Sequence, residues 1–251
     1  MRARAHAYVD ACGEYKTPYE RERLIQNWEK KQQTAKAVVE DFRKRAMDPK
    51  GKRILEVGFG NGAYIVAFSQ AGAEVHGLEV NETLLALANE LIKEEGVSAN
   101  IQLYDGSVFP YEKETFDAVY AISVLEHVDD RSLCMAEIAR VLKKGGCAYI
   151  AFPNRWWPRE THSGYWGISY LPIPLARFVL SLGGLQTIDD LNVHFIDFWT
   201  IKKLARAHGL SVRLEVEHGS PLRRLVKRTL AMFGIHHSAL LAHVMVVLDK
   251  P

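Results

Sequence analysis

The chain has 251 residues, of which 48% are hydrophobic and 25% charged, and this composition excludes a disordered, collagen-like or low-complexity protein. A chain of this length buries roughly three-quarters of its unfolded surface, so its fold does not depend on a disulfide or a metal. The 32 basic and 30 acidic residues give a net charge of +2, with an excess of acidic residues over 51–150 between basic flanks. This distribution argues against a nucleic-acid partner, because phosphate binding requires a continuous basic surface.

Cysteine usage and hydropathy indicate a cytoplasmic protein. Cys12, Cys134 and Cys147 are odd in number and lack ligand-like spacing, which predicts neither a disulfide framework nor a metal site. Residues 1–16 have no apolar core, so they do not resemble a signal peptide. The longest apolar stretch, 171–185, contains two prolines and is shorter than the roughly 20 residues that a membrane-spanning helix requires.

The chain begins with a long predicted helix and continues as alternating strands and helices. Apolar residues from Leu24 to Ala46 recur at helical spacing, and Pro49 and Gly51 close this run. Strands separated by single helices predict a parallel sheet covered on both faces. The expected strands are 53–57, 74–79, 100–104, 117–123 and 147–152, and the expected helices between them are 62–70, 81–95 and 130–143.

The pattern changes after Pro153 to an aromatic, proline-rich stretch that is too irregular for the sheet and reads as an inserted subdomain. Order returns with a predicted helix over 201–208, with Thr200 as its N-cap and Gly209 as its stop. Two further strands are expected at 211–217 and 242–248, with a basic helical segment at 222–233 between them.

A glycine loop at 58–62 follows directly after the first expected strand of the sheet. Gly58, Gly60 and Gly62 stand at alternate positions, so the backbone can turn sharply and approach a ligand with no side chain between them. Gly58, Gly60 and Ala63 also satisfy the dinucleotide-binding pattern, so the loop alone does not separate a dinucleotide from another nucleoside cofactor.

Three acidic residues at strand ends distinguish these two kinds of ligand. Glu56 precedes the first glycine, where it would repel a pyrophosphate and attract an ammonium group. Glu79 lies about 20 residues downstream of the loop, where an acid holds ribose hydroxyls, and Asp105 is placed to accept a hydrogen bond from an exocyclic amine. Together they favour a net cationic cofactor with a ribose and an adenine, which describes S-adenosylmethionine.

Four ordered motifs then resemble the class I S-adenosylmethionine-dependent methyltransferases. They are ILEVGFGNG at 54–62, HGLEVNETLLALA at 76–88, LYDGSVFPYEKETFDAVYAISVLEHV at 103–128 and ARVLKKGGCAYIAFPN at 139–154. The resemblance implies an α/β fold with a Rossmann-like sheet, mostly parallel and ending in an antiparallel hairpin, plus a lid insertion. It also implies an enzyme of the methyltransferase class that binds ribose through Glu79, adenine through Asp105 and the methionine portion along the glycines.

The predicted site and domains follow from this resemblance. The expected cofactor-binding residues are Glu56, Gly58, Gly60, Gly62, Glu79, Val80, Asp105, Gly106, Ser107 and Ser123. The expected domains are an N-terminal helical cap (1–50), a cofactor-binding core (51–152), a substrate lid (153–198) and a completion of the core sheet with a basic helical insertion (199–251).

Three histidines are candidates for a catalytic base. His127 lies after the fourth strand, where the resemblance places the reactive methyl group, and His162 and His194 flank the insertion. Each can equally be a structural residue. The aromatic lid indicates a large or greasy acceptor, and the core and lid resemble methyltransferases of quinone biosynthesis and of cell-envelope glycan biosynthesis, respectively.

The leading hypothesis is therefore O-methylation of a small, lipid-like or glycan metabolite. The alternatives are an NADP-dependent oxidoreductase, which Glu56 and the absence of a Tyr-x-x-x-Lys pair disfavour, and a non-catalytic scaffold that binds S-adenosylmethionine.

The basic residues Arg223, Arg224, Lys227 and Arg228 alternate with apolar ones, which is typical of peripheral membrane contact, of an anionic acceptor site or of a solvated helix face. The sequence does not specify an oligomeric state.

Overall fold

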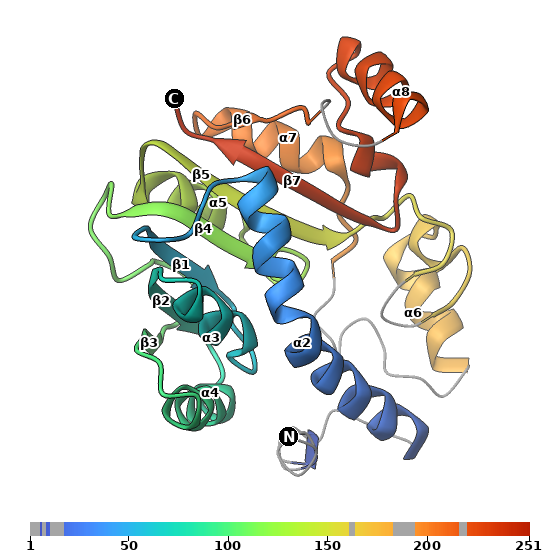
Figure 1. Cartoon of the computed structure of the whole chain (residues 1–251). Helices are drawn as coiled ribbons and strands as arrows, with labels where there is room; N and C mark the ends of the chain where they lie inside the picture. Colours follow the sequence, from blue (N-terminus) through green and yellow to red (C-terminus); the bar gives the residue numbers. More distant parts are fainter. Residues whose placement is uncertain (1–5, 7–8, 11–17, 161–163, 183–193, 216–219) are drawn as a thin grey trace. The chain divides into compact units, whose positions relative to one another are not determined.

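The computed structural model describes residues 6, 9, 10, 18–160, 164–182, 194–215 and 220–251 (Figure 1). Seven strands form one sheet in the order β3-β2-β1-β4-β5-β7-β6. The chain divides into two compact units, one comprising Met1–Ala121 with Val141–Lys143 and the other Ile122–Arg140 with Lys144–Pro251. The predicted α/β sheet, mostly parallel with antiparallel C-terminal strands, is confirmed.

The first unit contains the parallel part of the sheet. Strand β1 (Arg53–Val57) pairs in parallel with β2 (Glu74–Glu79) on one side and with β4 (Phe116–Ile122) on the other, and β2 pairs with β3 (Asn100–Leu103). Residues 54–57 of β1 are all buried, as expected for a strand that is covered on both faces.

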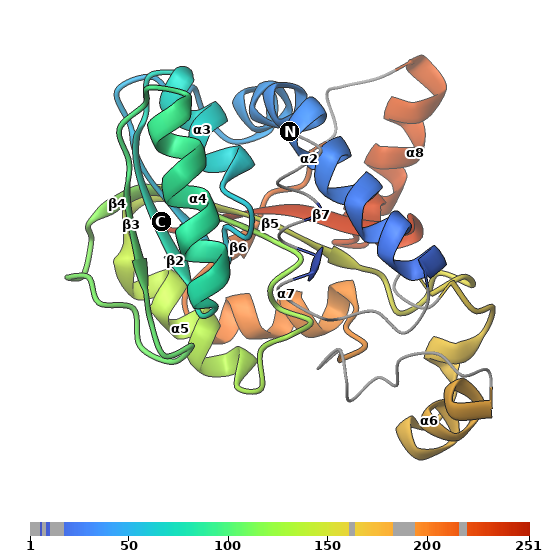
Figure 2. The ribbon, with the colours of Figure 1, turned by 90° about the horizontal axis from the view of Figure 1, so that it is seen from below.

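Three helices of the first unit pack in sequence beside these strands. Helix α3 (Ala63–Gln70) lies between α2 (Pro18–Arg45) and α4 (Glu82–Glu94), and Figure 2 shows α3 and α4 side by side. Phe42 of α2 meets Phe68 of α3 edge to face, with ring centroids 5.0 Å apart. The N-terminal helix is therefore part of the core of this unit, because its apolar stripe is buried against α3.

The second unit contains the antiparallel part of the sheet. Strand β7 (His243–Asp249) lies between β5 (Leu142–Pro153) and the two-residue strand β6 (Ser211–Val212), and it is antiparallel to both. Helix α5 (Arg131–Val141) precedes β5, and α7 (Phe198–Ala207) precedes β6. The hairpin expected from the sequence is present.

Two boundaries in this unit differ from the sequence prediction. Thr200 is not an N-cap: α7 begins earlier, and the side chain of Asp197 caps it by accepting a hydrogen bond of 2.8 Å from the Thr200 N–H. Strand β6 ends at Val212 rather than near residue 217: only Ser211 and Val212 pair with β7, and one further hydrogen bond of 2.8 Å, from the Arg213 N–H to the Val247 carbonyl oxygen, follows them. Residues 216–219 lie outside the described part of the chain.

The predicted lid connects β5 to α7. Its two ends meet where the Arg155 N–H donates a hydrogen bond of 2.9 Å to the Ile196 carbonyl oxygen. A short 3-10 helix, η1 (Ile168–Tyr170), and helix α6 (Ile173–Leu182) share a small core. Its buried members are Ile168, Ala176 and Leu180.

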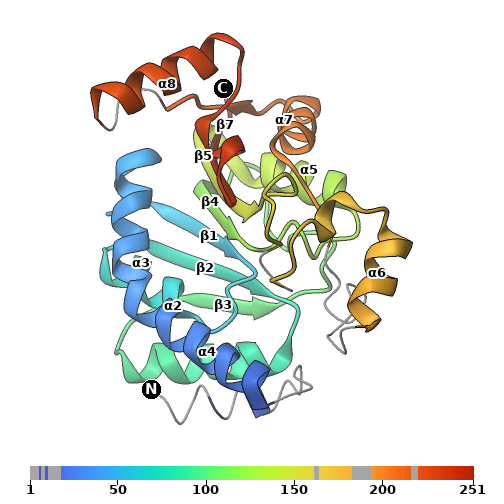
Figure 3. The same ribbon diagram turned by 90° about the vertical axis from the view of Figure 1, so that its right-hand side faces the viewer.

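Helix α8 (Pro221–Met232) follows β6, and a second 3-10 helix, η2 (His237–Leu240), leads into β7. Figures 2 and 3 show α7 and α8 on opposite sides of β7. Among the described residues, no helix combines the length and the apolarity that crossing a bilayer requires. Burial raises the pKa of the Cys134 thiol to about 12 and that of Cys147 to about 11, so both thiols are protonated at neutral pH.

Candidate cofactor site

The glycine loop turns sharply between β1 and α3. Gly58, Gly60 and Gly62 have φ angles of 66°, 58° and 75°, in the left-handed region that other residues rarely adopt. At Gly62 a side chain is also excluded by packing, since a Cβ atom would lie 2.8 Å from the Cβ of Ala88 in α4. Gly62 therefore allows α3 and α4 to approach closely, while Gly58 and Gly60 form the turn itself.

Glu79 fixes the conformation of this loop from the end of β2. Its Oε2 accepts a hydrogen bond of 2.9 Å from the Gly60 N–H, and its Oε1 accepts one of 2.9 Å from the N–H of Val80. The Glu79 residue is only 5% exposed. The Asn81 N–H also donates to Oε1, at 3.3 Å. A carboxylate has about four lone-pair directions, so these three contacts leave Glu79 able to accept one further hydrogen bond, at Oε2, from a ligand.

Glu56 places a second carboxylate beneath the same loop. It is 2% exposed, and its Oε2 is buried with no hydrogen-bond partner among the described residues. Burial raises the pKa of Glu56 to about 8, an effect that the Lys31 ammonium opposes and the Glu79 carboxylate reinforces. A buried acceptor without a donor is unfavourable, so this atom indicates that a ligand supplies the missing donor.

Lys31 is a residue of this site that the motifs did not reveal. Its Nζ lies 4.9 Å from the centroid of the Tyr64 ring and would be 3.3 Å from a Cβ atom at Gly60. Burial lowers the pKa of Lys31, whereas the charges of Glu56 and Glu79 raise it. The Lys31 amine thus lies against the glycine loop, within electrostatic reach of both Glu56 and Glu79.

The sequence does contain a signal for Lys31. Trp28, Ala35, Val39 and Phe42 form the buried stripe of α2, and Lys31 falls on the same stripe, three residues after Trp28 and four before Ala35. A lysine in a buried apolar stripe requires a polar partner, because burying an isolated charge is costly. This pattern points to a role for Lys31 but does not identify its partner.

Asp105, Gly106 and Ser107 form a polar turn after β3. The Oδ1 of Asp105 accepts hydrogen bonds from the Ser107 N–H (2.9 Å) and the Ser107 hydroxyl (2.6 Å), and these bonds lower the pKa of the exposed Asp105 carboxyl. Val80 lies beside this turn, because a Cβ atom at Gly106 would be 3.5 Å from its Cγ1, and the Val80 residue is 58% exposed. An exposed apolar surface thus adjoins an ionised carboxylate.

The residues of the first unit fit S-adenosylmethionine. Glu56 offers a buried oxygen that requires a donor, Glu79 has acceptor capacity at the end of β2, and Asp105 is ionised beside exposed Val80. The cofactor has an ammonium and a sulfonium, a ribose with two hydroxyls and an adenine with an exocyclic amine. A pyrophosphate would instead bring negative charge to a loop that already adjoins two carboxylates.

Ser123 and His127 belong to the second unit, in the turn between β4 and α5. Ser123 has a φ of 55°, a strained conformation for a residue with a side chain, and its N–H donates a hydrogen bond of 2.9 Å to the Ala151 carbonyl. His127 is half-buried, and its N–H closes a turn onto the Val124 carbonyl at 2.9 Å. Strain at a strand end is frequent in functional turns.

His194 contacts the same turn from the end of the lid. Its N–H donates a hydrogen bond of 2.6 Å to the carbonyl of Glu126, the neighbour of His127, and its Nε2 lies 3.3 Å from Oδ1 of Asp129. The structure therefore brings together two of the three predicted histidines at this turn. His162 lies outside the described residues.

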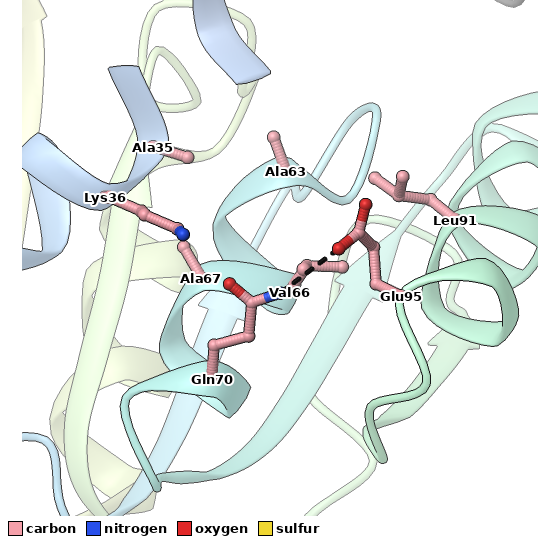
Figure 4. Close-up of a pocket in the computed structure, with 8 residues that line it drawn as sticks. All are labelled: Ala35, Lys36, Ala63, Val66, Ala67, Gln70, Leu91 and Glu95. Atoms are coloured by element: carbon pink, nitrogen blue, oxygen red, sulfur yellow. Dashed lines mark hydrogen bonds between the residues drawn. The ribbon is translucent and has the colours of Figure 1, made fainter. Parts of the chain in front are cut away.

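A separate cavity of about 220 Å³ lies between α2, α3 and α4 (Figure 4). Its polar lining consists of Lys36, Gln70 and Glu95, with a hydrogen bond of 3.2 Å between Gln70 Nε2 and Glu95 Oε2. None of the predicted site residues lines it. It is a groove between helices and not the cofactor site.

Comparisons with known proteins agree with this geometry. The family described as "Methyltransferase domain" matches residues 55–150. A ubiquinone biosynthesis O-methyltransferase of Coxiella burnetii is 26% identical over 163 residues, which cover 58% of this chain and 68% of that protein. One of Rhizobium etli with the same name is 29% identical over 180 residues, covering 65% of this chain and 71% of that protein.

A solved structure supports the same fold. A methyltransferase of Mesorhizobium loti described as dependent on S-adenosylmethionine superimposes with a TM-score of 0.59 at 16% identity, covering 84% of this chain and 96% of the other. The domain match and the curated relatives favour a methyltransferase over the oxidoreductase and scaffold alternatives. The chain is an S-adenosylmethionine-dependent methyltransferase whose residues 55–150 match the methyltransferase domain family.

Proposed function

We propose that the protein transfers a methyl group to a hydroxyl oxygen of a small or lipid-like molecule. The observation that carries the proposal is the buried, unpartnered Oε2 of Glu56 beneath a glycine loop that adjoins Glu79 and Lys31, because this arrangement suits a zwitterionic amino acid joined to a nucleoside. The names of the curated relatives support oxygen as the acceptor atom.

Each end of the cofactor has a partner in this proposal. Glu79 accepts from a ribose hydroxyl while it keeps its bond to Gly60, and Asp105 accepts from the adenine amine. Val80 and Gly106, which adjoin each other, contact the adenine ring, and Ser107 holds Asp105 in place. Ser123 remains a predicted contact from the second unit.

The methionine end is bound by opposite charges. Glu56 accepts a hydrogen bond from the ammonium group, which satisfies its orphaned oxygen, and Lys31 pairs with the carboxylate. The glycine loop allows this close approach because Gly58 and Gly60 have no side chains. When bound, S-adenosylmethionine supplies an electrophilic methyl group on a sulfonium sulfur.

Methyl transfer requires the substrate hydroxyl to lie close to the methyl group and a base to take the hydroxyl proton. A hydroxyl oxygen forms the new C–O bond as the C–S bond breaks, and the hydroxyl proton goes to His127 as general base. His194 and the aromatic lid, including the exposed Trp156 and Trp166, position the acceptor and exclude water. This assignment makes 153–198 the substrate lid, as the sequence predicts.

Methyl transfer from radiolabelled S-adenosylmethionine to three acceptor classes tests the proposal. The acceptors are hydroxylated aromatic rings with apolar tails, free sugars, and amines of matched size. We expect label in the hydroxylated aromatic class, as alkali-stable ether. Label confined to the amines would contradict O-methylation, and label confined to the sugars would replace the lipid-like acceptor by a glycan.

A further inference from the structure

Helix α8 carries an apolar stripe on its solvent side. The residues of this stripe, placed at about 100° per residue around the helix axis, fall within an arc of about 120°. This stripe consists of Leu222, Leu225, Val226, Thr229, Met232 and the capping residue Phe233. Leu222 is 71% exposed, Met232 84% and Phe233 73%. The hydroxyl of Thr229 donates to the Leu225 carbonyl at 3.0 Å, which satisfies the only polar side chain of the stripe within the helix.

The opposite side of α8 faces the protein. The half-buried residues of the helix are Arg224, Lys227, Leu230 and Ala231, and they lie on the side away from the stripe. No residue of α8 is buried. An amphipathic helix on a globular domain normally turns its apolar side inward, so the orientation of α8 is the reverse of the usual one.

The charges of α8 have one sign. The helix contains Arg223, Arg224, Lys227 and Arg228 and no acidic residue. Arg223 and Arg228 are exposed and lie on either side of the apolar stripe. The 3-10 helix η2 contacts α8, and its last residue Leu240 and the following Leu241 are also apolar and more than half exposed.

We propose that this stripe docks the protein on an anionic membrane surface, with α8 lying in the plane of the headgroups. An apolar stripe flanked by arginines is the arrangement that interfacial helices use, because apolar side chains enter the acyl boundary while bases meet lipid phosphates. A second copy of this chain fits poorly, since its α8 would bring the same four positive charges to the contact. A nucleic acid fits poorly too, because it offers nothing to the apolar centre.

The inference does not rest on the acceptor proposed above, and its test reads binding rather than turnover. The full chain is sedimented with phosphatidylcholine vesicles, with and without phosphatidylglycerol, at low and high salt. We expect sedimentation with the anionic vesicles only, and less of it at high salt.

Three variants separate the stripe from the charges. The stripe variant, Leu225→Gln with Met232→Gln and Phe233→Gln, should not sediment with the vesicles. The charge variant, Arg223→Gln with Arg228→Gln, should bind anionic vesicles about 30-fold more weakly, because each basic residue near an anionic surface contributes about 5-fold in affinity. The matched control, Lys203→Gln with Arg206→Gln on α7, removes the same charge from exposed positions outside α8 and should bind like wild type. All these side chains are exposed, and unchanged thermal melting confirms folding.

Four results would overturn the proposal. They are no sedimentation with anionic vesicles at low salt, equal sedimentation with neutral vesicles, full binding by the stripe variant, and equal weakening by the α7 control. Sedimentation velocity of the wild type and stripe variant reports the alternative: a dimer lost only in the stripe variant would assign the surface to a second copy.

Discussion

The Gly60 N–H and the Oε2 of Glu79 are joined by a hydrogen bond of 2.9 Å that links the tip of the glycine loop to the end of the neighbouring strand. Gly60 has a positive φ, so the same residue that turns the chain also directs its N–H at the carboxylate. Glu79 thereby performs two tasks: it orders the loop and supplies an acidic surface to the ligand. Loss of Glu79 therefore affects both the loop and the ribose contact.

Replacing Glu79 should weaken cofactor binding. Glu79→Ala removes the acceptor that binds the ribose, and charge-assisted hydrogen bonds contribute roughly 1.5 to 3 kcal/mol, so we expect affinity for S-adenosylhomocysteine to fall about 10- to 150-fold by calorimetry. Glu79→Gln keeps one oxygen acceptor and should fall between wild type and Glu79→Ala. Unchanged affinity in both variants would remove Glu79 from the site.

Lys31→Met tests the pairing with the methionine carboxylate. The variant should bind S-adenosylhomocysteine at least about tenfold more weakly, since a charge-assisted contact is lost, but should bind methylthioadenosine, which lacks the amino-acid portion, like wild type. Lys36→Met is the matched control, because Lys36 lies on the same helix but lines the separate cavity in Figure 4.

Two other outcomes of the Lys31→Met experiment would contradict the pairing of Lys31 with the methionine carboxylate. Tighter binding of S-adenosylhomocysteine by Lys31→Met would show that the ammonium occupies the place of the ligand and must be displaced. Equal losses for both ligands would show that Lys31 acts through the loop rather than through the carboxylate.

The protonation of Glu56 predicts a pH dependence of binding. Burial raises its pKa to about 8, and a cationic ligand favours the ionised form, so binding should release a proton and tighten as the pH rises toward that value. The affinity gain is at most about tenfold per pH unit below the pKa. Calorimetry in buffers of different ionisation enthalpy measures the released proton. Glu56→Gln should lose this release, and equal release by the variant would assign the proton to another group.

His127 should affect turnover rather than cofactor affinity. If it removes the hydroxyl proton, His127→Ala should lower turnover about 100-fold, while the affinity for S-adenosylhomocysteine stays near that of the wild type. His194→Ala serves as comparison, because His194 contacts the same turn through Glu126 and Asp129. Full activity of His127→Ala with an impaired His194→Ala would move the base to the lid. Full activity of both would leave proximity as the source of the rate.

Local patterns explain which features could be predicted from the sequence. The strands of the parallel sheet and the glycine loop were recognisable because continuous apolar segments and alternating glycines are local signals. The predicted start of α7 is wrong, because Asp197 and Thr200 can both cap a helix. Only the tertiary packing of Phe198 settles which of them does. The length of β6 depends on its pairing with β7, which no local pattern encodes.

The candidate site also contains residues that local sequence patterns predict and one that depends on tertiary packing. Glu56, Glu79 and Asp105 were found from their positions at strand ends, whereas Lys31 lies in a helix that precedes the matched motifs and meets the loop only through the packing of α2 on α3. The outward stripe of α8 was visible as an amphipathic pattern, but the pattern alone does not say which side faces the protein.

Calorimetric titration of the wild-type protein with S-adenosylhomocysteine, and separately with NADPH, tests the central claim most directly. The claim is that the acidic glycine loop binds an adenosyl amino acid. We predict saturable binding of one S-adenosylhomocysteine per chain, no heat of binding with NADPH, and loss of affinity in Glu79→Ala. Saturable binding of NADPH with none of S-adenosylhomocysteine would contradict it.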